Sequence, residues 1–168
     1  MKKMRVTNTL TEGLEKFAMQ EKIENEKAAK AVAVQLLNFC AVGSPAEPTM
    51  PPIETGYLRG SGSVFVNNTF VSATPKVNGL GDPLRSFSFT FDKSHIVISI
   101  VYNTPYAARW HETYGWIPGG RTPSVAKQNN PNITRNVGNK WIEKHLKADG
   151  KDLMYLYAKR IKRGLFKE

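Results

Sequence analysis

The sequence has a single cysteine, few acidic residues and no apolar run long enough to cross a bilayer. With Cys40 alone, an intrachain disulfide and a four-thiolate zinc site are both excluded, and synthesis in a reducing compartment is expected. A membrane helix needs about twenty apolar residues, and residues 7–15 are polar where a secretory signal would be apolar. The sequence therefore predicts a soluble protein that no signal sequence exports.

Acidic residues are outnumbered, with 14 Asp and Glu against 24 Lys and Arg, which gives a formal charge of +10. This balance favours acidic partners such as nucleic acid, an anionic surface or an acidic patch on a protein. The densest basic cluster lies near the C-terminus, on a predicted helix whose other face is apolar. Such a cluster is usually the solvated side of a helix, although the same charges can also bind the phosphates of a nucleic acid. The basic cluster comprises Lys159, Arg160, Lys162, Arg163 and Lys167.

Residues capable of catalysis are present, but their spacing is not catalytic. His111-Glu112 begins like a zinc-protease helix, yet Gly115 stands where the second histidine belongs. Cys40 ends an apolar helical face, where a free cysteine usually acts as a small hydrophobic residue. We therefore predict no catalytic residue, no metal ion, no cofactor and no enzymatic activity. The alternative that the protein is a small hydrolase is supported only by Cys40 and His111-Glu112.

The first part of the chain has helical periodicity. Thr9 and Glu12 form a capping-box pattern, and apolar residues at helical spacing continue from there to Phe39. The sequence predicts one long or once-broken helix over 9–39. Prolines then recur through 41–55, where neither a helix nor a central strand can continue, so we expect an extended connector.

The middle of the chain has the patterns of strands. Residues 64–71 predict a hairpin that turns at Asn67-Asn68, because asparagine tolerates the left-handed backbone of a tight turn. Residues 85–92, with phenylalanine at alternate positions, form the clearest predicted strand. After a turn at 92–94, the β-branched run 95–102 predicts a strand that is covered on both faces. An antiparallel sheet is therefore expected.

The last third alternates between helix and loop. Residues 105–112 predict a short helix that begins at a proline, and 113–131 predict a long exposed loop, a type of segment that usually has a function or a partner. Helical spacing returns over 137–165, with a break or kink at Asp149-Gly150. Residues 1–168 thus predict a single α+β domain: an antiparallel sheet of about four strands, flanked by a long N-terminal helix and C-terminal helices.

Two short motifs resemble those of a known family. The first is Pro-Ile-Glu-Thr-Gly-Tyr-Leu-Arg-Gly-Ser at 52–61, and the second is Tyr-Asn-Thr-Pro-Tyr-Ala-Ala-Arg-Trp-His-Glu at 102–112. Their sequence and their order around a predicted sheet resemble the neck proteins of tailed bacteriophages, which are also described as head-tail joining, tail-completion or minor capsid proteins. Glu54 departs from the family pattern, in which aspartate is commoner at this position.

The resemblance implies a non-catalytic structural virion protein that forms or joins a ring at the head-tail junction. Its partners would be further copies of itself in a homo-oligomeric ring and the neighbouring portal, connector or tail proteins, with nonspecific contact to packaged DNA and no membrane. It would be made in the host bacterial cytoplasm and reside in the neck or proximal tail of the virion. The resemblance does not decide between the roles of adaptor, stopper, tail terminator and minor head protein. The alternative is a basic DNA-binding accessory or assembly factor of the phage.

The motif residues are expected to fix the fold, and nearby aromatic residues to meet partners. Arg59 is predicted to form an ion pair with Glu54 or Glu112. The expected fold-fixing set is Glu54, Thr55, Gly56, Leu58, Arg59 and Glu112. Large apolar rings in and beside an exposed loop usually need cover from a partner. The interface candidates are Tyr106, Trp110, Trp116 and Ile117.

Overall fold

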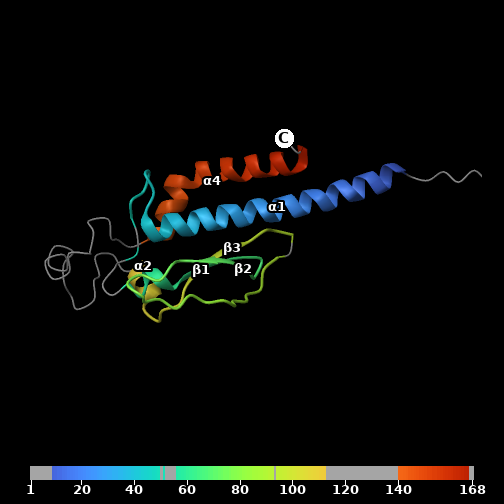
Figure 1. Cartoon of the computed structure of the whole chain (residues 1–168). Coiled ribbons are helices and arrows are strands. Elements are labelled where there is room, and N and C mark those ends of the chain that lie inside the picture. The colour runs from blue at the N-terminus through green and yellow to red at the C-terminus, as the bar shows by residue number, and fades with distance from the viewer. Residues whose placement is uncertain (1–8, 50, 52–55, 93, 113–139, 167–168) are drawn as a thin grey trace, which may run out of the picture.

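The computed structural model describes residues 9–49, 51, 56–92, 94–112 and 140–166, and these have an α+β fold (Figure 1). The elements are helix α1 (Thr9–Val42), the 3-10 helix η1 (Arg59–Ser61), strands β1 (Gly62–Val66), β2 (Thr69–Ala73) and β3 (Ile98–Tyr102), and helices α2 (Ala107–Glu112) and α4 (Trp141–Phe166). Helix α1 lies between the sheet on one side and α4 on the other (Figure 1). Among the described residues, neither long helix is apolar enough over its length to span a membrane.

Helix α1 is the central element of the fold, and it confirms the predicted N-terminal helix. It runs without a break to Val42, slightly past the predicted end at Phe39. Gly43 follows with φ +83°, a left-handed conformation that commonly ends a helix and that glycine adopts without strain. Helix α1 is buried on two faces, formed by Ala29, Ala33 and Leu37 toward the sheet and by Val32, Leu36 and Cys40 toward α4.

The antiparallel sheet was predicted, and it has three strands within the described residues, in the order β2-β1-β3. The hairpin β1-β2 turns at Asn67-Asn68, as predicted, and both residues have positive φ, 48° and 64°. Strand β3 begins only at Ile98, and all its residues are half-buried, so the expected strand over 95–102 with cover on both faces is wrong in its extent and burial. Strands β2 and β3 form the two edges of the sheet.

The segment 85–92, the clearest predicted strand, is not a strand in the structure. Its alternating rings do share one face: Phe87 lies 5.7 Å from Phe65 of β1, and Phe89 and Phe91 continue the row at 5.7 and 5.3 Å between centroids. In place of a β-ladder, the Asn68 side chain donates to the Phe89 carbonyl and accepts from the Phe89 amide. The alternation therefore corresponds to one partly buried face, but not to the backbone pairing that makes a strand.

Helix α4 is continuous, so the predicted break at Asp149-Gly150 is wrong. Asp149 lies on the buried face of the helix, where its carboxylate accepts hydrogen bonds, and Gly150 remains helical beside it. The short helix predicted at 105–112 is present as α2, which begins at Ala107. The predicted loop 113–131 lies outside the described residues.

Replacing Gly150 with alanine is expected to stabilise the protein by about 0.5–1 kcal/mol, because alanine loses less backbone entropy inside a helix. A Cβ at Gly150 would meet no described atom within 4 Å. Gly164 is the matched control, since a Cβ there would collide with the Glu24 carboxylate of α1. This carboxylate is buried and accepts from Gln20 and Lys27, so displacing it should destabilise. Urea unfolding followed by circular dichroism measures both variants. Shifts of the same sign would contradict this account of α4.

Candidate functional sites and surfaces

Arg59 is buried, and it binds the backbone of the proline-rich connector. Its Nε and Nη2 donate to the Pro51 carbonyl at 3.2 and 2.6 Å. Burial lowers the pKa of Arg59 to about 10, so the guanidinium remains charged at neutral pH. The predicted partner Glu54 lies outside the described residues, and within them no ion pair joins Arg59 to Glu112. Arg59 therefore ties the connector to η1 through a carbonyl.

Two further residues of the first motif have structural roles. Gly56 has φ +91°, and a Cβ there would overlap Val77, so the turn requires glycine. Leu58 is buried in the cluster that joins α1 to α4. Thr55 lies outside the described residues. The described part of the motif thus positions the chain that enters β1.

Helices α2 and α4 meet in a cluster of charged side chains at the points where the described chain stops at Glu112 and resumes at Lys140. His111 Nδ1 lies 2.9 Å from Glu112 Oε1, and its Nε2 lies 2.7 Å from Glu143 Oε2, an ion-pair distance without hydrogen-bond alignment. Lys140 contacts the Glu112 carboxylate and lies 3.5 Å from Glu143. The hydrogen bond from Lys140, followed by that from His111, lowers the pKa of Glu112. We call these four residues the α2-α4 latch.

The α2-α4 latch brings together residues that the sequence did not relate. His111, Glu112 and Glu143 offer one nitrogen and two carboxylate oxygens within 4.8 Å of one another, a grouping that could hold a metal ion. Lys140 already places a positive charge between the two carboxylates. Since both carboxylates are more than half exposed, this geometry acts foremost as a set of ion pairs that fixes the start of α4 beside α2.

A second polar network, buried at the other side of α4, joins this helix to the connector. His145 Nδ1 lies 2.8 Å from Asp149 Oδ2, and His145 Nε2 lies 2.8 Å from the Thr49 carbonyl. The Ser44 hydroxyl donates to the same carboxylate at 2.8 Å. A carbonyl accepts only, so Nε2 must carry a hydrogen, and the Nδ1–Oδ2 contact then needs a further shared proton. His145 and Asp149 therefore form one buried, proton-sharing pair.

The Ser44, His145 and Asp149 side chains are those of a hydrolytic triad, but their order is different. The hydroxyl donates to the carboxylate instead of the imidazole, and the outer imidazole nitrogen is bound to a carbonyl, so no base faces the hydroxyl. Cys40 is fully buried, and burial raises the pKa of its thiol to about 12, which keeps it protonated and unreactive. These groups thus favour a structural over a nucleophilic role.

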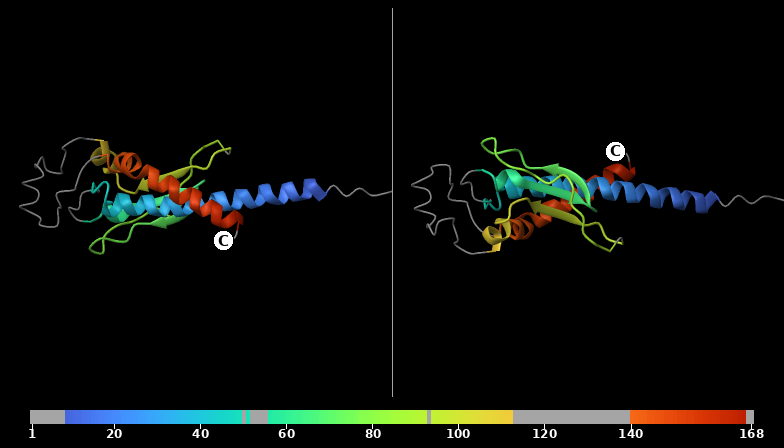
Figure 2. Two further views of the ribbon diagram at one scale, coloured as in Figure 1. Left: turned by 90° about the horizontal axis from the view of Figure 1, so that it is seen from above. Right: turned by 90° about the horizontal axis from the view of Figure 1, so that it is seen from below.

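The N-terminal turns of α1 carry apolar side chains that no other described residue covers. The exposed fractions are 60% for Leu14, 53% for Phe17 and 68% for Met19. The last turns of α4 reach α1 only near Glu24, which closely approaches Gly164. Figures 1 and 2 show α1 continuing well beyond both α4 and the sheet. We call residues 13–23 the α1 overhang.

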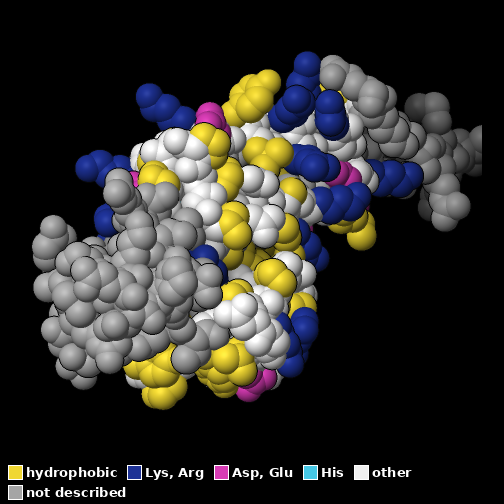
Figure 3. Space-filling view, turned by 60° about the vertical axis from the view of Figure 1, so that its left-hand side comes forward, with side chains coloured by type: hydrophobic (Ala, Val, Ile, Leu, Met, Phe, Trp, Pro, Cys, Tyr) yellow, Lys and Arg dark blue, Asp and Glu magenta, His cyan; other side chains and the backbone are white. Residues whose placement is uncertain are grey.

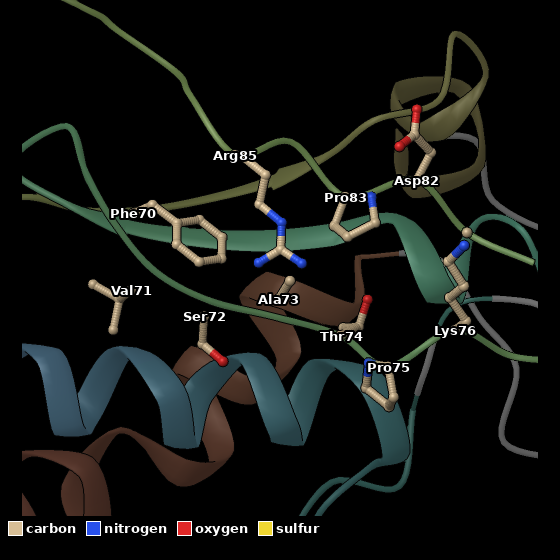
Figure 4. A pocket seen from close by; sticks show the side chains of 11 residues that line it. Phe70, Val71, Ser72, Ala73, Thr74, Pro75, Lys76, Asp82, Pro83 and Arg85 are labelled. Atoms are coloured by element: carbon tan, nitrogen blue, oxygen red, sulfur yellow. The ribbon is translucent and has the colours of Figure 1, made fainter.

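A groove of about 660 Å³ lies along the edge strand β2, between this strand and residues 81–85 (Figure 4). Arg85 lies over the Phe70 ring at 4.8 Å from its centroid, a cation-π contact. Lys76 and Asp82 add one charge of each sign. The groove therefore offers apolar surface, charges and the edge of the sheet in one place.

The interface residues predicted from sequence fall mostly outside the described structure. Tyr106 is exposed just after β3. The Trp110 side chain, Trp116 and Ile117 lie outside the described residues. In the basic cluster, Lys159, Arg160, Lys162 and Arg163 are exposed on α4, and Lys167 is not described. The α1 overhang was missed, because its apolar residues have the same helical spacing as core residues.

No protein-family model, curated protein or solved structure matches this chain. The resemblance to phage neck proteins therefore rests on the two motifs at 52–61 and 102–112.

Proposed function

We propose that this chain is a non-catalytic structural subunit of a tailed-phage virion, which assembles with copies of itself into a ring at the head-tail junction. The two sequence motifs support the location. The observation that carries self-assembly is the α1 overhang, because exposed apolar residues at helical spacing on one end of a helix mark a surface that a partner covers.

A closed ring requires two different surfaces on each subunit, one of which binds the other on the next copy. The α1 overhang is one such surface, at the far end of the molecule from α2 (Figure 1). The groove beside β2 is a second, because the edge of a sheet presents unpaired backbone groups that a neighbouring chain can pair with. The portal, connector or tail proteins would then bind the assembled ring.

Gold labelling of intact virions with an antibody against this chain tests the location. Electron microscopy should show label at the neck or the top of the tail. Label over the capsid shell or at the tail tip, or particles without label, would contradict it. Sedimentation velocity over a range of protein concentrations tests assembly separately, and a protein that stays monomeric at all of them would count against the ring.

A further inference from the structure

One face of α4 carries an almost continuous row of lysines. Positions three or four apart on a helix lie on the same face, and the row follows this spacing along most of α4. Its members, which we call the lysine ladder, are Lys144, Lys147, Lys151, Tyr155, Lys159 and Lys162. Tyr155 is 68% exposed, and Lys159 lies 5.8 Å from the centre of its ring. The ladder thus extends the C-terminal basic cluster toward the start of the helix.

The positive charge belongs to α4 and not to the long helix beside it. Helix α4 has seven Lys and Arg against three Asp and Glu, whereas α1 has four against five. One of the three acids of α4, Asp149, is buried in the network with His145. Helix α4 packs mainly against α1, and its start also contacts the sheet, through Trp141 and Tyr102. It therefore forms one outer layer of the described fold, and Lys and Arg side chains line that side in Figure 3.

We propose that the lysine ladder binds the phosphate backbone of duplex DNA. From Lys144 to Lys162 the helix rises by about 27 Å at 1.5 Å per residue, a length over which each DNA strand presents about eight phosphates. Lysines match phosphates as flexible point charges that read no sequence, and the Tyr155 hydroxyl can donate to a phosphate within the same row.

Because the basic residues of the ladder are all lysines, DNA is favoured over an acidic protein as the partner. Lysine is depleted in the cores of protein-protein interfaces, where its strongly hydrated ammonium and long side chain are unfavourable. In contact with DNA the same ammonium stays partly hydrated and releases condensed counterions, so a row of exposed lysines is favourable. The proposal does not depend on ring formation, because the ladder and the α1 overhang are separate surfaces.

The test is the binding of a short fluorescent duplex, followed by anisotropy between about 50 and 200 mM salt. Binding by the wild type should weaken steeply as salt rises. In the triple variant Lys147→Gln, Lys151→Gln, Lys159→Gln, we expect affinity at low salt to fall at least about tenfold, and the slope of log affinity against log salt to become shallower by about two to three. All three side chains are exposed, so thermal unfolding should be little changed.

The matched control removes three exposed lysines outside the ladder, as Lys16→Gln, Lys22→Gln and Lys76→Gln, and lowers the net charge equally. Because these three lie in the surfaces proposed for assembly, binding is compared at concentrations where sedimentation velocity shows all proteins in the same oligomeric state. It should retain most of the affinity. Equal losses in the two triple variants would show an effect of net charge alone and overturn the ladder. Wild-type binding that is absent or insensitive to salt would also overturn it, as would tighter binding to polyglutamate than to DNA, which would indicate an acidic protein partner.

Discussion

Replacing Asp149 with alanine should lower the free energy of unfolding by about 2–6 kcal/mol, because it leaves two buried polar groups unsatisfied at about 1–3 kcal/mol each. The Asp149 carboxylate accepts from Ser44 and faces His145, which is fully buried. Alanine would leave the hydroxyl and the ring nitrogen without a partner and away from water. Alanine also favours helix more than aspartate does, by several tenths of a kcal/mol, so helix propensity cannot explain a loss.

Asp152 provides the control, because it lies on the same helix three residues later and is exposed. Its replacement by alanine should change stability by about 0.5 kcal/mol or less. Asparagine at position 149 should be intermediate, since its side-chain oxygen can still accept one of the two hydrogen bonds. Urea unfolding at neutral pH measures all three variants. If Asp149→Ala and Asp152→Ala behave alike, the buried network does not hold the connector to α4.

Local signals in the sequence predicted the elements that local interactions define. The capping box and apolar spacing located α1, and two asparagines located the hairpin turn. The prediction failed at 85–92, because alternation of phenylalanines reports one buried face and does not report whether a neighbouring strand is available. In the structure, this face is partly buried where Phe87 contacts Phe65, but Asn68 provides the hydrogen bonds to the backbone.

The polar network and the latch could not be predicted, because each joins residues that are distant in sequence. Asp149 before Gly150 resembles a helix break, and its role depends on Ser44, which follows α1. The one local signal was the spacing of His145 and Asp149, which places two polar groups on the same side of a helix. Their burial follows from the packing of α4 against α1, which no local pattern contains.

Leu14 and Phe17 have the helical spacing of core residues, and the structure exposes them. A helical stripe is buried only where a second element runs alongside it, and α4 reaches α1 no further than the region of Glu24. Because α1 is longer than its described neighbours, apolar residues with the spacing of core residues are left on the surface at its N-terminal end. The proposed self-assembly surface therefore follows from the relative lengths of the helices, which the sequence pattern alone did not show.

The double variant Leu14→Ser, Phe17→Ser should weaken self-association about a thousandfold, while the subunit remains folded. Truncating a large apolar side chain at the centre of an interface typically removes about 2 kcal/mol, and two such losses amount to about 4 kcal/mol. Both side chains are already more than half exposed in the described structure, so their loss removes little from the core. Sedimentation velocity should show a monomer at concentrations where the wild type is assembled.

The double variant Glu15→Ser, Lys16→Ser distinguishes the effect of losing the apolar surface from the effect of weakening the helix. Both residues are exposed between Leu14 and Phe17, and their joint removal leaves the net charge unchanged. Serine lowers helix propensity at least as much in this variant as in the Leu14, Phe17 variant, because phenylalanine and serine have similar propensities. The charged-pair variant should therefore assemble nearly as the wild type does. Equal loss of assembly in both would attribute the effect to fraying of α1, whereas full assembly of the Leu14, Phe17 variant would remove the α1 overhang from the interface.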